Sequence, residues 1–172
     1  VSPYRLTFHL TNAVIIYSFL LWTCIEYYHL KSLQFISFFK TKEFWIFISI
    51  ILVFITIMSG GFMAGSHAGQ SFNTYPLMNG KIIPDDIYLE DLGILNAFEN
   101  TVTINFNHRW LATFTFIYIF SLFTYLIFNK FIKLSNIIII LVLLALTLQF
   151  ILGIMALLSN VAIQYGSLHQ TN

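Results

Sequence analysis

Charged side chains are scarce in this chain of 172 residues, since Asp, Glu, Lys and Arg together make up 9% of the sequence. A soluble globular domain carries charge on about a quarter of its residues, so the composition argues against a soluble protein. The formal net charge is +1, which provides no basic field of the kind that binds nucleic acid. The sequence therefore predicts neither a soluble domain nor a nucleic-acid-binding protein.

Cysteine is almost absent as well. Cys24 is the one cysteine and lies in an apolar run, which excludes an intrachain disulfide and a CxxC metal site. No P-loop, nucleophile triad or HExxH motif is present, and no cleavable signal peptide is apparent. The chain opens on Val1 and stops at Asn172 inside an expected helix, so we interpret it as a fragment of a longer protein.

Long apolar runs dominate what is present. The sequence is 58% hydrophobic with a mean hydropathy of +0.82, and four segments have the ~20 residues that cross a bilayer. They span residues 6–28, 44–65, 104–128 and 135–158, and a fifth begins near Val161 and is truncated. Backbone groups in lipid must bond internally, and the runs lack the alternation of barrel strands, so they are helices. We predict an all-α, polytopic transmembrane helical bundle.

The connections set the orientation, because basic loops stay on the inner side of a membrane. Two connections are basic, and the long one between the second and third helices is acidic. The basic residues are Lys31, Lys40 and Lys42 in the first connection and Lys130 and Lys133 in the third; the long loop holds Asp85, Asp86, Glu90, Asp91 and Glu99 against Lys81. The long loop, the N-terminus and the start of the fifth helix are therefore expected to face outward.

The long loop has two halves of different character. The first carries Gly and Pro turn signals. The second places Tyr88, Leu92, Leu95 and Phe98 at helical spacing, which predicts a short amphipathic helix on the outer surface. An ordinary surface loop is the alternative interpretation, and the sequence does not decide between the two.

Three histidines lie at a similar depth, near the outer ends of helices that run in the same direction: His9, His108 and His169. Neutral imidazole is a good ligand for iron, and haem iron takes one histidine on each face. A small residue lies one turn from each, namely Ala13, Ala112 and Gly166, on the same helix face. A single such histidine is more often a hydrogen-bonded interfacial residue, and that remains our reading of His29 and His67.

Two arginines accompany these histidines. Arg5 lies one turn before His9, and Arg109 follows His108. Arginine pairs with carboxylates in a bidentate manner, so both are candidate partners for haem propionates, with contact to lipid headgroups as the alternative. Small and polar residues form a stripe on the third helix (Thr101, Asn105, His108, Ala112, Thr115). The series Gly61, Gly65 and Gly69 predicts a close-packing face on the second helix.

Four blocks spread along the chain resemble the haem A synthase family: "VSPYRLTFHL", "GGFMAGSHAGQSFNTYPLMNGKIIP", "FENTVTINFNHRW" and "LLSNVAIQYGSLHQ". Their order is that of the family. The resemblance implies eight transmembrane helices in two related four-helix halves, of which this chain holds the fourth to the eighth. Residues 1–35 would then be the last helix of the N-terminal half with an inner linker. Residues 36–172 would be the C-terminal half, the haem b domain.

The resemblance also implies roles for the histidines. His108 and His169 would hold a haem b for electron transfer. His9 would belong to the catalytic site, where the substrate haem O is modified, together with a histidine and a glutamate from an earlier helix. Because that helix is absent here, we expect this fragment to be unable to catalyse the reaction by itself.

The family reaction oxidises a methyl group of haem O to a formyl group, giving haem A for cytochrome c oxidase. The resemblance implies an electron donor such as a ferredoxin, contact with the lipid bilayer, and haem O synthase as a further partner. The loop from Ala68 to Thr103 has no cysteine, as in the branch found in mitochondria and related bacteria. The implied location is the bacterial cytoplasmic membrane or the mitochondrial inner membrane. The alternative function is a membrane b-type cytochrome that only relays electrons.

Overall fold

The computed structural model describes residues 2–28, 42–129 and 136–171, and within these ranges it is built of helices. The long helices are α1 (Pro3–Tyr28), α2 (Lys42–Gly65), α4 (Thr101–Phe128) and α5 (Asn136–Leu158). Shorter pieces are η2 (Ala68–Gln70), η3 (Glu90–Leu95), α3 (Asn96–Glu99) and α6 (Ile163–Thr171). The predicted all-α helical bundle is confirmed. The four long helices are apolar and long enough to cross a membrane.

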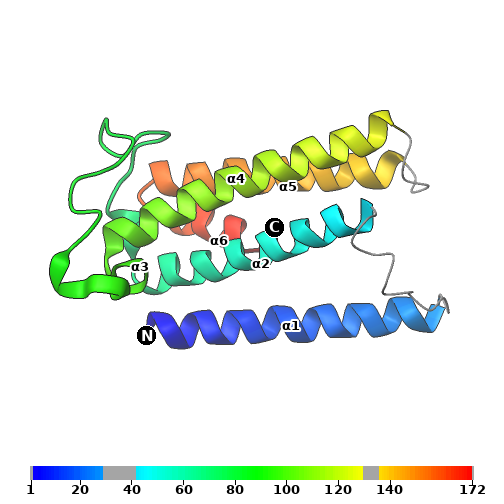
Figure 1. The fold of residues 1–172 in the computed structure, drawn as a ribbon, viewed down its shortest axis with the longest axis horizontal. Helices are drawn as coiled ribbons and strands as arrows, with labels where there is room; N and C mark the ends of the chain where they lie inside the picture. The colour runs from blue at the N-terminus through cyan, green and yellow to red at the C-terminus, as the bar shows by residue number, and fades with distance from the viewer. Residues whose placement is uncertain (1, 29–41, 130–135, 172) are drawn as a thin grey trace.

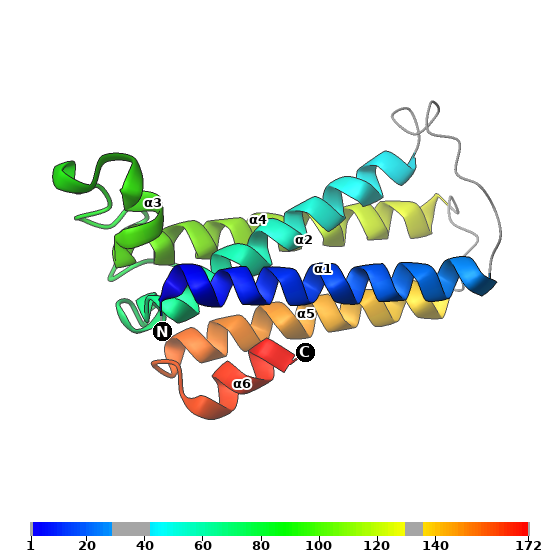
Figure 2. The ribbon, with the colours of Figure 1, turned by 90° about the horizontal axis from the view of Figure 1, so that it is seen from below.

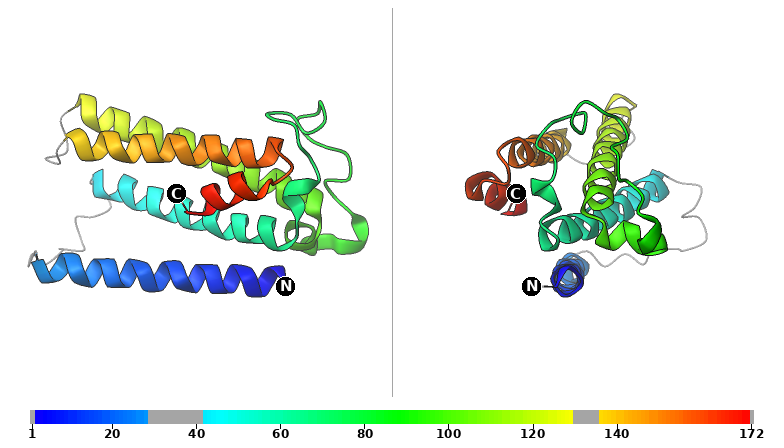
Figure 3. Two further views of the ribbon diagram at one scale, coloured as in Figure 1. Left: turned by 180° about the vertical axis from the view of Figure 1, so that it is seen from behind. Right: turned by 90° about the vertical axis from the view of Figure 1, so that its left-hand side faces the viewer.

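The long helices lie side by side, with the loop between α2 and α4 covering one end of the bundle (Figure 1). Helices α1, α4 and α6 all start at that end, whereas α2 and α5 run toward it (Figures 2 and 3). The prediction that the first, third and fifth helices share one direction is therefore correct. We call the end that carries α3 the outer end.

Several predictions concern residues outside the described ranges. The basic side chains of the orientation argument fall there (Lys31, Lys40, Lys130 and Lys133), and so does His29. The domain boundary predicted between residues 35 and 36 lies there too. The assignment of the outer end to the outer face of a membrane thus remains a prediction.

Glycines let α1 approach α2 closely. A Cβ atom on Gly61 would lie 2.9 Å from Thr7 Oγ1, and one on Gly65 would lie 2.6 Å from Pro3 Cα. Because a side chain at either position would overlap α1, both glycines act as the predicted close-packing face. Gly69 lies beyond α2, in η2, and faces Val161 instead.

Polar contacts and stacked rings join the remaining helices. Between α2 and α4, the hydroxyls of Thr56 and Thr115 are 2.9 Å apart, and the Tyr118 hydroxyl donates to the Trp45 carbonyl at 3.1 Å. Between α4 and α5, Phe116 stacks on Phe150 with ring centroids 4.4 Å apart. These contacts set α4 between α2 and α5, with its polar stripe facing α2.

The second half of the long loop was open between two alternatives, an amphipathic helix and an ordinary surface loop. The segment forms the short helices η3 and α3 with a break at Gly93, whose φ of 48° lies in the left-handed region. The Asn96 side chain accepts a hydrogen bond from the Leu89 amide at 2.8 Å and donates to the Leu89 carbonyl at 2.7 Å. Such side-chain bonds compete with a continuous helix, so the segment folds into a tight, bonded loop.

Candidate functional site

His108 lies two turns inside α4 and rests on α2. Helix α4 begins at Thr101 because the Asn100 side chain accepts a hydrogen bond from the Val102 amide at 3.0 Å. His108 Nδ1 lies 2.7 Å from Ser59 Oγ. A Cβ atom on Gly60 would lie 3.2 Å from His108 Cε1. The His108 ring is therefore held by the Ser59 hydroxyl and lies against α2 at Gly60, which has no side chain.

His169 is held on α5 in the same manner. Its Nδ1 lies 3.2 Å from the Gln149 carbonyl oxygen, and the Gln149 side-chain amide donates to the His169 carbonyl at 2.9 Å. A Cβ atom on Gly153 would lie 2.9 Å from His169 Cε1. The reciprocal bonds fix the short helix α6 against α5, and the glycine makes room for the imidazole.

The two histidines occupy matching depths. Gly60 is five residues from Gly65, the last residue of α2, and Gly153 is five residues from Leu158, the last residue of α5. Five residues of helix rise ~7.5 Å, so each imidazole sits about that far below the outer end. The helices that carry them, α4 and α6, both pack on α5. The structure thus places the two histidines that the sequence paired at similar depths on two helices that contact α5, and their pairing on one haem stays a prediction.

The donor atoms of this pair fit a haem iron. A carbonyl oxygen only accepts, so His169 Nδ1 must carry the proton and Nε2 keeps its lone pair. Within the described ranges no hydrogen bond involves Nε2 of His108 or His169. A metal-binding histidine usually donates its other ring N–H to an oxygen in this way. Two free Nε2 atoms at one depth match the axial ligand set of a b-type haem.

A metal centre made of protein ligands alone is a different case. The part of the chain that the structure describes contains no group of three or more His, Cys, Asp or Glu side chains placed to hold a metal ion. A haem needs only two axial ligands from the protein, because the porphyrin supplies the other four. The arrangement of His108 and His169 therefore suits a haem better than a free ion.

His9 lies elsewhere, on an exposed face of α1. Thr7 is buried against Gly61 of α2, and two residues along a helix turn the side chain by ~200°. His9 therefore faces away from α2, and Arg5, one turn earlier, is exposed on the same side. The structure does not bring His9 together with His108 and His169, which agrees with a separate site.

Arg109 is buried, with 7% of its surface exposed. Its Nε donates to Asn105 Oδ1 at 2.6 Å, and its two terminal nitrogens donate to the Thr74 carbonyl at 2.5 Å and the Phe72 carbonyl at 2.6 Å. Three of the five N–H donors of the guanidinium thus bond to protein. Two N–H groups of Arg109 remain for the predicted contact with a haem propionate. The bonds to the Phe72 and Thr74 carbonyls also anchor the outer loop to α4.

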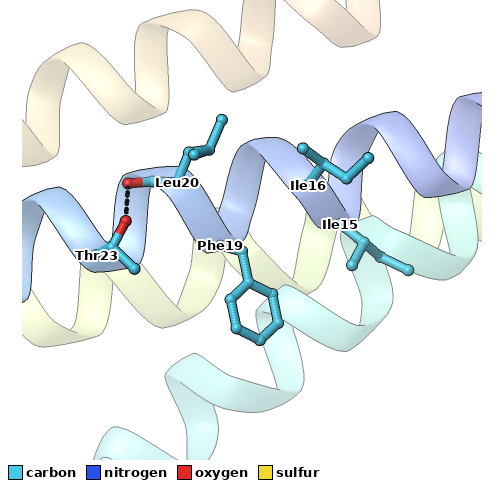
Figure 4. Close-up of a pocket in the computed structure, with 5 residues that line it drawn as sticks. All are labelled: Ile15, Ile16, Phe19, Leu20 and Thr23. Atoms are coloured by element: carbon cyan, nitrogen blue, oxygen red, sulfur yellow. Dashed lines mark hydrogen bonds between the residues drawn. The ribbon is translucent and has the colours of Figure 1, made fainter.

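A hollow of about 270 Å³ lies on α1, and neither His108 nor His169 lines it (Figure 4). Its lining is Ile15, Ile16, Phe19, Leu20 and Thr23. The one hydroxyl in this lining, that of Thr23, donates to the Leu20 carbonyl at 2.8 Å. The hollow offers no free polar group to orient a ligand, so it is an apolar surface of the helix.

Sequence reasoning missed the residues that support the two imidazoles: Ser59, Gly60, Gln149 and Gly153. One signal was available, because Gly153 interrupts a run of large apolar residues in the middle of a helix. Glycine there costs about 1 kcal/mol relative to alanine, which points to a packing reason. Ser59 gave no such signal, since serine on an apolar helix commonly bonds to its own backbone.

Comparisons with known proteins identify the family of the chain. The sequence model of the COX15-CtaA family, described as a cytochrome oxidase assembly protein, matches residues 1–172. The chain is 39% identical over 170 residues to the haem A synthase of Granulibacter bethesdensis, covering 99% of this chain and 44% of that protein. The haem A synthase of a Wolbachia from Culex pipiens is 36% identical over 170 residues, covering 99% and 49%. "Heme A synthase COX15" of Arabidopsis thaliana is 39% identical over 180 residues, covering 99% and 38%.

The chain spans less than half the length of these three relatives. No solved structure matches it. The match of the family model runs over the whole chain, and the resemblance to haem A synthases drawn from four sequence blocks is confirmed. The chain belongs to the COX15-CtaA family of cytochrome oxidase assembly proteins, the family of the haem A synthases.

Proposed function

We propose that the protein containing this chain oxidises the methyl group of haem O to a formyl group, giving haem A for cytochrome c oxidase. The observation that supports the proposal is the pair His108 and His169: each has its Nδ1 bonded, and each ring lies against a glycine five residues from the outer end of its helix. The relatives are named haem A synthases, which supports haem chemistry as the role of this pair. The proposed location is the bacterial cytoplasmic membrane or the mitochondrial inner membrane.

In this proposal His108 and His169 are the axial ligands of a haem b. When bound, a haem b supplies one-electron transfer. The chain's own part is to hold two imidazoles in place without further adjustment: Gly60 and Gly153 let each ring lie against a helix, and the Nδ1 bonds set how each ring is turned. Side chains held in this way would need little rearrangement during electron transfer.

The substrate site is proposed on the free face of α1, around His9. Haem O carries a long apolar tail, which suits entry from lipid along a helix whose side chains are apolar and exposed, such as Phe8 with 66% of its surface exposed. Arg5, one turn from His9, offers a positive charge for a propionate. A second histidine would come from outside this chain, and a soluble electron donor such as a ferredoxin and haem O synthase are the proposed partners.

The second candidate function is a membrane b-type cytochrome that relays electrons. The same pair, His108 and His169, favours it, whereas an exposed His9 beside Arg5 has no part in a simple relay. Co-expression of the full-length protein with a source of haem O, followed by haem extraction and chromatography, separates the two. Haem A accumulates if the protein is a synthase, and only haem b and haem O are recovered if it is a relay.

The ligand assignment is tested by replacing His108 and His169 with alanine, singly and together. Each single variant should lose the low-spin haem spectrum of the purified protein or convert it to high spin, because one axial bond is missing. The double variant should retain none of the low-spin signal. Absorption spectroscopy of the oxidised and reduced protein measures this directly.

His67→Ala is the matched control, since His67 is exposed just beyond the end of α2. It should leave the haem spectrum at the wild-type level. A full low-spin signal in the His108→Ala, His169→Ala double variant would contradict the ligand assignment.

A further inference from the structure

The hydroxyl of Ser59 has two hydrogen-bonding partners. Its Oγ lies 3.0 Å from the Thr56 carbonyl on the same helix and 2.7 Å from His108 Nδ1 on α4. A serine hydroxyl has one proton to give and accepts with its lone pairs. A carbonyl can only accept, so the proton of Ser59 can satisfy only one of its two neighbours.

Both contacts are hydrogen bonds in just one arrangement. If Ser59 donates to the Thr56 carbonyl, its oxygen is free to accept a proton from His108 Nδ1–H. If Ser59 donated to His108 Nδ1 instead, the Thr56 contact would have no proton and one bond would be lost. The pair of distances therefore favours the form of His108 with its proton on Nδ1 and a lone pair on Nε2.

We infer that Ser59 is a positioning residue for His108, which keeps Nε2 ready to bind iron and lowers the reduction potential of the haem. This inference rests on the proposed haem ligation by His108. Gly60 contributes as well, because it has no side chain where the imidazole ring lies. A Cβ atom at this position would come within 3.2 Å of His108 Cε1. The Ser59 hydroxyl fixes the orientation of the imidazole ring, and Gly60 lets the ring lie close to the backbone of α2.

His169 has a different kind of partner. Its Nδ1 is bonded to a backbone carbonyl, that of Gln149, which no side-chain substitution removes. The protein thus holds one ligand through a backbone atom and the other through the side chain of Ser59. A change at Ser59 alters the His108 side of the haem alone, which makes this contribution measurable.

The direction of the effect on potential follows from charge. An oxygen that accepts the Nδ1–H bond increases the electron density on the imidazole and strengthens its bond to ferric iron more than to ferrous iron. Removing that acceptor favours the ferrous state. Removing a polar oxygen beside the site also disfavours the more highly charged ferric haem. Both effects raise the reduction potential.

The test is Ser59→Ala in the purified full-length protein, followed by potentiometric titration of the haem and by ferric electron paramagnetic resonance. The expected result is a low-spin haem whose midpoint potential is shifted upward and whose resonance spectrum changes, since that spectrum reports the orientation of the axial rings. Ser49→Ala is the matched control, because the buried Ser49 hydroxyl on the same helix donates to the Trp45 carbonyl. The control should keep the wild-type potential.

A Ser59→Ala protein that stays low-spin with an unchanged midpoint potential and an unchanged resonance spectrum overturns the inference. If Ser59→Ala loses the haem, Ser59→Thr decides, because threonine keeps the hydroxyl. Haem binding at the wild-type potential in Ser59→Thr supports the inference, and loss of haem there overturns it. Failure of the proposed function would show differently, as an absence of low-spin haem from the wild-type protein.

Discussion

At the residue scale, Arg109 shows how a charge is accommodated inside a membrane helix. Charged groups in such positions are costly unless they are paired or bonded. Arg109 bonds to the Asn105 side chain one turn before it and to the carbonyls of Phe72 and Thr74 in the outer loop. Asn105 in turn donates to the Ala68 carbonyl at 2.6 Å. The two side chains thus fasten the start of the outer loop to α4, next to His108.

Arg109→Lys should release this part of the loop while keeping the positive charge. Lysine lacks the planar fork that reaches several acceptors at once, and a hydrogen bond to a charged group contributes ~1.5–3 kcal/mol. Hydrogen exchange of the Ser71 and Asn79 amides, which bond to the Ala68 carbonyl and to Thr74 Oγ1 on either side of this stretch, should therefore speed up by on the order of tenfold or more. Mass spectrometry of the exchanged peptides measures the change.

Lys81→Ala serves as the control for that experiment, because the exposed Lys81–Asp85 ion pair contributes little. It should leave the exchange of the Ser71 and Asn79 amides as in the wild type. Unchanged exchange in Arg109→Lys together with a loss of haem would contradict the anchoring role and favour a direct contact of Arg109 with a propionate.

The sequence singled out the candidate ligands His108 and His169 but not the residues that contact them. His108 and His169 stand out because ionisable groups are rare in apolar helices. Ser59 and Gln149 carry no charge, and their roles depend on which helix lies opposite, which is a long-range property. Arg109 was found as a charged residue, but its bonds to Phe72 and Thr74 depend on the course of the loop, which the sequence left open.

At the scale of the elements, the contact of α1 with α2 depends on close approach of two backbones. Apolar helices in lipid gain little from hydrophobic burial, so their association depends on packing. Gly61 and Gly65 permit that packing against Thr7 and Pro3. The Tyr4 hydroxyl also donates to Glu99 Oε1 at 3.0 Å, and the Tyr4 ring packs edge-on against Phe62. These contacts hold the outer end of α1, where His9 lies.

Gly65→Leu should separate the outer ends of α1 and α2. Its Cβ atom would meet Pro3 Cα at 2.6 Å, and backbone cannot move aside as a flexible side chain can. Overpacking of this kind costs ~1–3 kcal/mol or more. A lower midpoint of thermal unfolding in detergent is the expected result.

Ala64→Leu is the control, since Ala64 is the neighbouring residue of α2 and is exposed. Its unfolding midpoint should stay near that of the wild type. Equal midpoints for the Gly65→Leu and Ala64→Leu proteins would show that α1 does not pack on α2 through this glycine.

Element boundaries were predicted within a few residues where the sequence has a local signal. The third membrane helix was expected at residue 104 and begins at Thr101, because Asn100 caps it. The first was expected at residue 6 and begins at Pro3, a residue that suits the first turn of a helix. For the outer loop the sequence could not decide between a helix and an ordinary loop, since apolar spacing carries no information about the left-handed Gly93 or the side-chain bonds of Asn96.

At the scale of the whole molecule, the helices form two similar pairs. In one, His108 of α4 rests on Gly60 of α2; in the other, His169 of α6 rests on Gly153 of α5. Helices α2 and α5 run toward the outer end, and α4 and α6 run away from it (Figure 3). The two histidines thus lie on corresponding helices of the two pairs, α4 and α6. Helix α1 lies outside this arrangement, packed on α2 with the His9 face left free.

This arrangement separates the two proposed haem sites, and His9→Ala tests the separation. In the full-length protein co-expressed with a source of haem O, His9→Ala should reduce haem A to background, because a ligand of the substrate site is lost. The low-spin haem b spectrum should remain, because His9 faces away from α2, on which His108 rests. Haem extraction with chromatography and absorption spectroscopy measure the two outcomes in the same preparation.

The pattern across variants is what distinguishes two sites from one. His108→Ala should disturb the haem b spectrum, whereas His9→Ala should leave it intact and affect the product alone. If His9→Ala also abolished the low-spin spectrum, His9 would belong to the same site as His108 and His169, against the exposed position of its side chain on α1. If haem A formed at the wild-type level in His9→Ala, the substrate would bind elsewhere, and the free face of α1 would serve contact with lipid or another helix.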